Sequence, residues 1–239
     1  MAGRKRASLP WARGPWSSTR RGSTIAAVTN KVGASASPAG SCRLTCGARP
    51  RSPRCCRFSI GARPNGEKEL LAVEDGCRES AESWKALLRD LKRRGMTAPA
   101  LAVGDGALGF WAAVREVWPE TREQACWCHK LGNVLHKLPK RLQPRAKRAL
   151  HEMMYAESRA ECEAAKLRFE AEYQAKYPKA VESLTAHWER LVTFFDFPAE
   201  HWKHLRTTNV IESPFATVRL RERATRGAGS RTKGLLMAF

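Results

Sequence analysis

The chain has 239 residues, enough for one sizeable domain with an appendage, and a formal net charge of +20. Residues 1–66 contain 13 Lys and Arg and no acidic residue, while the remainder has 30 bases against 23 acids. This excess of positive charge suits a polyanionic partner such as DNA. No run of about 18 apolar residues occurs, and the first residues lack a continuous apolar segment. We therefore expect neither a membrane span nor a secretory signal.

The first part of the chain has the composition of a tail. Residues 1–59 are rich in Ser, Gly, Pro, Ala and Arg and show neither a helical nor a strand period. Such a segment cannot bury enough apolar surface to fold. We predict a disordered basic tail, with order beginning near Ile60.

From Ile60 onward, strand patterns alternate with helix patterns. We predict a strand at Lys68–Asp75 and then a helix that is capped by Ser80 and ends at Gly95. The apolar face of this helix is formed by Trp84, Leu87, Leu88 and Leu91. Three further elements follow: a buried strand at Ala100–Asp105, a helix at Leu108–Trp118 and a strand at Glu123–Cys128.

The pattern becomes almost wholly helical from Lys130 to about Trp188, and a last helix is expected to begin near Thr208. Alternating strands and helices followed by a helical block indicate an α/β core with a helical insertion. We assign residues 60–139 and 201–230 to the core and residues 140–200 to the insertion.

The stretch "LAVGDGALGF" (Leu101–Phe110) places Asp105 between Gly104 and Gly106 and fits the G-x-G-x-x-G fingerprint of dinucleotide sites. A carboxylate in that turn would repel a pyrophosphate, and no acid follows a second hydrophobic strand to hold the ribose. A plain turn with Asp as a turn former is the simplest alternative. Its position beyond the carboxyl end of a buried strand makes Asp105 a candidate metal ligand.

Glu212 is the second candidate acid, in "TTNVIESPFATVRLRER". It would lie near the start of the last helix, where the helix dipole also favours a glutamate with no further role. The basic residues of this region suit a phosphate backbone, and we predict DNA contacts from Arg206, Arg219, Arg221, Arg223 and Arg226.

Eight cysteines lie in a chain too large to need disulfides, which indicates a reducing, cytoplasmic setting. The segment "CWCHK" (Cys126–Lys130) offers two thiols and an imidazole, but no paired ligands follow at zinc-site spacing. We interpret Cys126 as a buried strand residue and Trp127 as core. His129 is predicted to point from the strand end into the same cleft as Asp105.

Read together, these segments resemble the mutator-type transposases of bacterial insertion sequences. The residues that carry the resemblance run from about Gly61 to Phe239 and include "RGMTAPALAVGDGALGFW", "PETREQACWCHKLGNVLHKLPK" and "FFDFPAEHWKHLRTTNVIESPFATVRLR". The resemblance implies a ribonuclease-H-like core with a helical insertion, DNA as partner, and a bacterial, nucleoid-associated location. It also implies a homo-oligomer, or a mixed oligomer with full-length transposase.

The resemblance further implies DDE chemistry, in which three carboxylates hold two Mg²⁺ or Mn²⁺ ions for attack on phosphodiesters. Such ions need several hard oxygen ligands. Asp105 matches the second acid and Glu212 the third, so both would be catalytic metal ligands. Cys126 and His129 match the family's C-x-x-H signature, and we place His129 among the catalytic residues. Val210 departs from the proline usual before the Ile-Glu pair.

The first acid of the triad has no match. Asp75 ends a predicted strand and Asp90 lies within a predicted helix, and no acidic residue precedes Glu67. The family's N-terminal DNA-binding region is missing too, and residues 231–239 look like a truncated C-terminus. A shifted reading frame of Ser41–Ser59 can resemble an upstream family segment, so we expect a decayed, inactive fragment. The alternative is a non-catalytic DNA-binding protein that inhibits full-length transposase.

Overall fold

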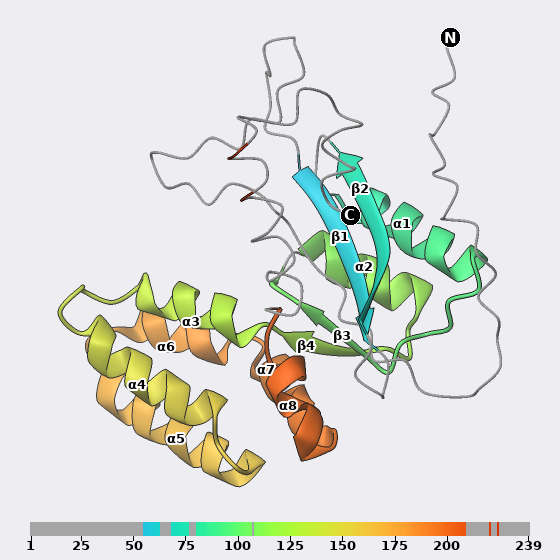
Figure 1. Cartoon of the computed structure of the whole chain (residues 1–239). Coiled ribbons are helices and arrows are strands. Elements are labelled where there is room, and N and C mark those ends of the chain that lie inside the picture. Colours follow the sequence, from blue (N-terminus) through green and yellow to red (C-terminus); the bar gives the residue numbers. More distant parts are fainter. Residues whose placement is uncertain are drawn as a thin grey trace, which may run out of the picture.

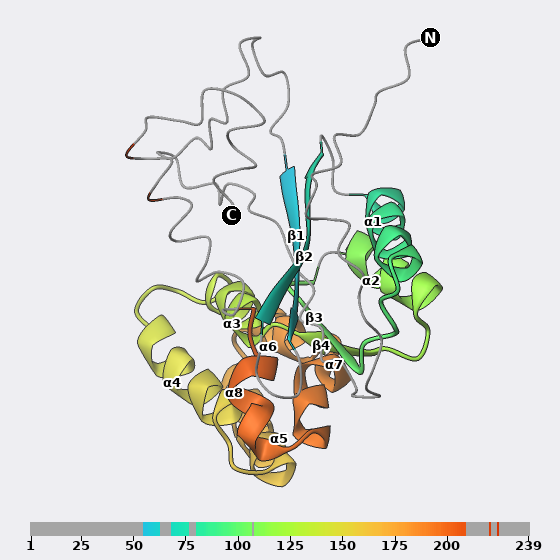
Figure 2. The same ribbon diagram turned by 45° about the vertical axis from the view of Figure 1, so that its right-hand side comes forward.

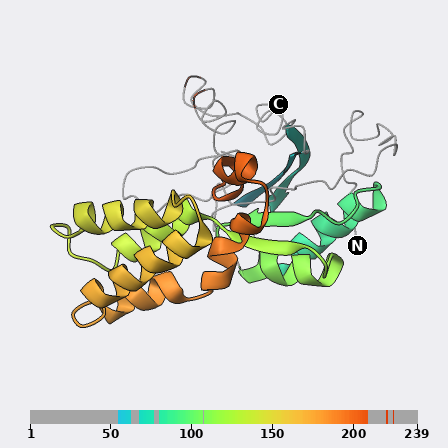
Figure 3. The same ribbon diagram turned by 90° about the horizontal axis from the view of Figure 1, so that it is seen from below.

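The computed structural model of the chain describes residues 55–62, 68–76, 80–106 and 108–208, with Leu220 and Ala224 beyond them. Figure 1 shows the strands with α1 and α2 at one side and the helical block α3–α6 at the other. Figure 3, a view from below, shows the same separation. The helices and strands fit the predicted α/β core with a helical block.

The described strands form two two-stranded sheets. Strand β1 (Cys55–Ala62) pairs antiparallel with β2 (Lys68–Gly76), and β3 (Leu101–Gly104) pairs parallel with β4 (Arg122–Ala125). β1 thus includes residues 55–59, the last five of the predicted tail, where no strand was expected. The segment has no clear alternation of its own and takes its order from pairing with β2, a tertiary effect that local pattern does not report.

Helix α1 (Ala81–Arg93) confirms the predicted cap and apolar face. Ser80 forms a capping box with Ser83, and the four predicted core side chains, Trp84, Leu87, Leu88 and Leu91, are buried. Helix α2 (Leu108–Val117) packs beside α1 (Figure 2). Their shared core also takes in Leu71 from β2 and Ala102 from β3. These two helices therefore hold both sheets against one apolar layer.

The chain leaves the sheet earlier than predicted. β4 ends at Ala125 and α3 (Trp127–Leu135) begins two residues later, so the strand expected at Glu123–Cys128 is wrong in its second half. The cause is a tertiary contact, because the Trp127 N–H donates to the Arg206 carbonyl at 2.9 Å. Cys126 is buried, as predicted, but as the residue that precedes a helix.

The predicted helical region is confirmed. It comprises α4 (Gln143–Met154), α5 (Arg159–Tyr173) and α6 (Pro178–Thr185), followed by the short helices α7 (Trp188–Val192), η2 (Thr193–Asp196), η3 (Ala199–His201) and α8 (Trp202–Leu205). Its core is continuous with Leu101 and Val103 of β3. No helix in the described ranges is both long and apolar enough to cross a bilayer.

Candidate functional site

The carboxyl ends of β3 and β4 meet at one edge. Gly104 is the register partner of Ala125, and the Cys126 N–H donates to the Gly104 carbonyl at 2.7 Å. Asp105 directly follows Gly104 and is half-buried. The parallel pairing thus brings Asp105 beside the start of α3, which carries His129 in its first turn.

Packing and backbone conformation explain two glycines of the turn. A Cβ on Gly104 would lie 2.7 Å from Trp111 Cζ2, so only glycine lets α2 approach the strand end this closely. Gly106 has a φ of +100°, a conformation that other residues rarely adopt. Both requirements come from the strand-to-helix turn itself and involve no nucleotide. They favour a turn that fixes Asp105 over a dinucleotide fingerprint.

Cys126 joins this edge to a distant segment. Its Sγ lies 3.3 Å from Thr208 Oγ1, and the Thr208 N–H donates to the same sulfur at 3.4 Å. The hydrogen bond from Cys128 lowers the pKa of the Cys126 thiol well below its ordinary value. His129 lowers it further through a hydrogen bond and its charge, although burial opposes both. Cys126 therefore ties the first turn of α3 to Thr208.

Of the predicted site residues, the structure brings Asp105, Gly104, Gly106, Cys126 and His129 to this one edge. Of the predicted last helix after Thr208, the structure describes only Leu220 and Ala224, both helical. The remaining candidates lie outside the described residues: Glu212, Arg219, Arg221, Arg223 and Arg226. Within the described ranges, no three His, Cys, Asp or Glu side chains form a group that could hold a metal. Asp105 is thus the only predicted acid ligand that the structure places.

Arg206 takes part in packing that the sequence did not predict. Its Nη1 donates to the Met154 carbonyl at 2.5 Å, and its guanidinium lies 4.7 Å from the centre of the Tyr155 ring. Its carbonyl receives the Trp127 N–H that begins α3. Burial lowers the pKa of this guanidinium. These contacts fasten the returning chain to the helical block.

Gln124 is a structural residue that the sequence reading missed. It is fully buried, its Nε2 donates to the Leu191 carbonyl at 2.9 Å, and its Oε1 accepts from the Phe194 N–H at 2.7 Å. Trp127 Nε1 donates to the same Leu191 carbonyl at 2.9 Å. The sequence could have indicated this role, because Gln124 is a polar residue at an inward-facing position of a short strand. Together these bonds fix α7 and η2 to β4 and to the start of α3.

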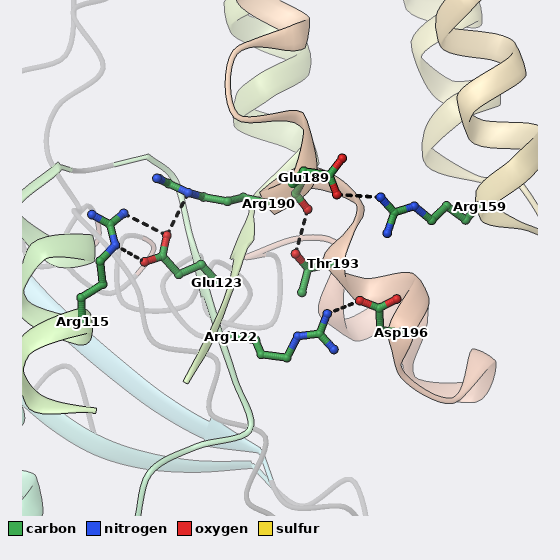
Figure 4. Close-up of a pocket in the computed structure, with 8 residues that line it drawn as sticks. All are labelled: Arg115, Arg122, Glu123, Arg159, Glu189, Arg190, Thr193 and Asp196. Carbon is green, nitrogen blue, oxygen red and sulfur yellow. Dashed lines mark hydrogen bonds and ion pairs between the residues drawn. The ribbon is translucent and has the colours of Figure 1, made fainter. Parts of the chain in front are cut away.

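A pocket of about 420 Å³ is lined by residues from the amino-terminal end of β4 and from α2, α5, α7 and η2 (Figure 4). Asp105 lies beside the other end of β4, because Gly104 is the register partner of Ala125. The arginines of the pocket are all engaged with acids. Glu123 accepts from Arg115 at 2.6 Å and from Arg190 at 2.9 Å, and the other two ion pairs join Arg159 to Glu189 and Arg122 to Asp196. This network links α2 and β4 to the helical block, so we interpret it as structural.

The sequence of this chain is similar to those of known proteins. Residues 48–228 match the family described as "Transposase, Mutator family". The chain is 60% identical over 175 residues to the transposase for insertion sequence element IS6120 of Mycolicibacterium smegmatis, covering 73% of this chain and 54% of the relative. It is 52% identical over 195 residues to the transposase for IST2 of Acidithiobacillus ferrooxidans, covering 81% and 65%. The chain thus spans between half and two-thirds of these relatives.

Proposed function

Because the chain belongs to the Mutator family of transposases, we propose that the β3–β4 edge is part of a metal-dependent site for cutting and joining DNA. Asp105 and Glu212 would be its acid ligands, with His129 and Cys126 beside them, on a ribonuclease-H-like core. The observation that carries this proposal is the contact between Cys126 and Thr208.

That contact limits how far Glu212 can lie from Asp105. Thr208 is four residues before Glu212, and four residues span at most about 14 Å when fully extended. Thr208 contacts Cys126, whose N–H is bonded to the residue before Asp105. A return of Glu212 to the Asp105 edge is therefore within reach of the chain.

The chemistry of the donors fits a hard divalent cation. Carboxylate oxygens suit Mg²⁺ and Mn²⁺, whereas the sulfur of Cys126 is already hydrogen-bonded to Thr208 inside the protein. When bound, a pair of such ions polarises the phosphodiester and lowers the pKa of an attacking water or hydroxyl. Asp105, held by the Gly104–Gly106 turn, would orient them, and α3 would shield one side of the site.

We further propose that this polypeptide, as its sequence stands, lacks one ligand. Asp90 lies on α1 and is ion-paired with Arg93 at 2.5 Å. Asp75 lies on β2, where its register partner is Cys56 of β1. Neither lies on a strand next to β3. Asp105 and Glu212 alone supply two negative charges for two divalent ions, so metal affinity and transition-state stabilisation are both reduced.

The free edge of β3 supports this proposal. In the parallel ladder, Ala100 and Gly104 bond to β4, so Leu101 and Val103 direct their N–H and C=O groups to the opposite edge. Both residues are fully buried, yet within the described ranges no strand pairs with this edge. Buried backbone groups are nearly always hydrogen-bonded. The edge is where a strand carrying a further acid would pair.

Mn²⁺ binding tests the proposed ligands independently of activity. We expect weak Mn²⁺ binding, followed by electron paramagnetic resonance, that Asp105→Asn and Glu212→Gln each abolish. Asp90→Asn is the matched control, since it removes an acid that lies on α1, and it should leave binding unchanged. Equal loss in the control, or full binding in Asp105→Asn, would refute the ligand assignment.

A strand-transfer assay tests the missing ligand and the alternative raised from the sequence. With labelled element ends and Mn²⁺, we expect DNA binding without efficient strand transfer. Efficient transfer that Asp105→Ala abolishes would show that another acid completes the site. If the chain instead inhibits a full-length relative at equal concentration while Asp105→Asn inhibits equally well, the non-catalytic inhibitor is the better description.

A further inference from the structure

A basic stretch without acidic residues lies at one end of the helical block. The 28 residues from Gln124 to His151 contain seven Lys and Arg and no acid. Lys130 turns inward, where its Nζ donates to the Ser183 and Ala186 carbonyls at 2.9 Å each. The other six are exposed and form what we name the α3–α4 patch: Lys137, Lys140, Arg141, Arg145, Lys147 and Arg148.

This patch is largely uncompensated. Arg145 is ion-paired with Glu172 at 2.8 Å, but the other five members have no ion-pair partner among the described residues. Neighbouring α5 has three bases and four acids over Arg159–Tyr173, so its charge is nearly balanced. The positive charge is thus local to the connection between α3 and α4 and to the first turns of α4.

The patch also coincides with the positive end of a helix. α4 begins without a side-chain cap and without an acid in its first turn. Lys140, Arg141 and Arg145 therefore add cationic charge where the helix dipole already disfavours it. An anion lying there would relieve this repulsion. This charge distribution favours the binding of a polyanion to the patch.

We infer that the α3–α4 patch binds the sugar–phosphate backbone of duplex DNA on one flank of the proposed cutting site. This inference rests on the proposed function for the choice of DNA. α3 starts at the Asp105 edge and its nine residues rise about 14 Å, or about four base pairs of DNA at 3.4 Å each. Figures 1 and 3 show the α3–α4 connection at the end of the helical block away from the strands.

The expected binding is electrostatic and independent of sequence. Each phosphate that is neutralised contributes about −0.9 to the slope of log affinity against log salt concentration. Loss of two cations from the patch should therefore reduce the slope by about 2. The same loss at a site that does not contact DNA should change the slope little.

The test is fluorescence anisotropy of the full chain with a 30-base-pair duplex between 50 and 300 mM KCl. The variant is Arg141→Gln/Arg148→Gln, and its matched control is Arg89→Gln/Arg93→Gln, which removes two exposed arginines from α1. Circular dichroism verifies that both variants fold. We expect the slope to fall by about 2 in the patch variant and by less than about 0.5 in the control.

Equal changes in the two variants would assign the effect to net charge and overturn the inference, as would no change in either. Binding of the patch to anionic phospholipid vesicles but not to duplex DNA would also overturn it. Asp105→Asn separates the two proposals, since it should abolish Mn²⁺ binding and leave the salt slope intact. A patch variant that still binds Mn²⁺ and has the same salt slope as the parent protein refutes only this inference.

Discussion

Gly104→Ala tests whether close packing at the end of β3 holds the candidate site. The new Cβ would lie 2.7 Å from Trp111 Cζ2 and 3.1 Å from Phe110 Cδ1, and both rings are only 2% exposed. Phe110 is itself held against Trp84, with ring centroids 5.1 Å apart, so neither ring has room to move. Inserting a methyl group into such a core costs typically 1–3 kcal/mol. We expect a loss of about 2–3 kcal/mol in the free energy of unfolding.

The assay is guanidinium denaturation followed by tryptophan fluorescence, with Gly132→Ala as the matched control. Gly132 lies within α3 and a Cβ there meets nothing within 4 Å, so alanine should stabilise the protein by about 0.5–1 kcal/mol. The two substitutions should thus differ by about 3 kcal/mol and have opposite signs. A Gly104→Ala protein within about 0.5 kcal/mol of the parent would refute the packing argument.

Three further predictions follow from the described contacts. Gln124→Leu should destabilise the fold by about 2–3 kcal/mol, measured by the same denaturation, because it leaves the Phe194 N–H without its buried acceptor; Gln174→Leu on the surface is the control. Burial raises the pKa of the Cys162 thiol to about 12 from an ordinary 9.0. The contribution of this neutral thiol to the free energy of unfolding is therefore complete below pH 9 and is lost as the pH rises toward 12. The free energy of unfolding of Cys162→Ala should fall less over that range, as measured by the same denaturation. Exposed Cys128 should react with iodoacetamide at pH 8 well before buried Cys162, and peptide mapping showing the reverse order would contradict the burial.

Local signals predicted α1 well and the end of β4 badly. Ser80 and Gly95 mark the ends of α1 through their own side chain and backbone, so residues close in sequence suffice to place it. The segment from Glu123 to Cys128 is mostly apolar and looks like a buried strand. The bond that begins α3 runs from Trp127 to Arg206, 79 residues away, and no local pattern contains it.

The same distinction holds at the candidate site. Asp105 could be singled out because it lies directly beyond the carboxyl end of a short apolar strand pattern, which is a local signal. Asp105 lies close to Cys126 because β3 pairs with β4, and the alternation of strands and helices already favours this pairing. The contact between Cys126 and Thr208 spans 82 residues and could not be read from spacing. Arg206 was assigned to DNA on charge alone, since charge does not report that a guanidinium packs on Tyr155.

The contacts around α3 explain how a helical block can interrupt this core while the points where the chain leaves and returns stay joined. The chain leaves β4 at Cys126 and returns at Arg206, and the two points are joined by the Trp127–Arg206 and Cys126–Thr208 bonds. The block is fixed at this junction by Gln124 and Trp127, which both bond to Leu191. The distance between Asp105 and Thr208 therefore depends on this junction and not on the length of the helices between them. Changes in the outer helices should alter contacts along DNA while the junction, and with it the geometry of the candidate site, stays the same.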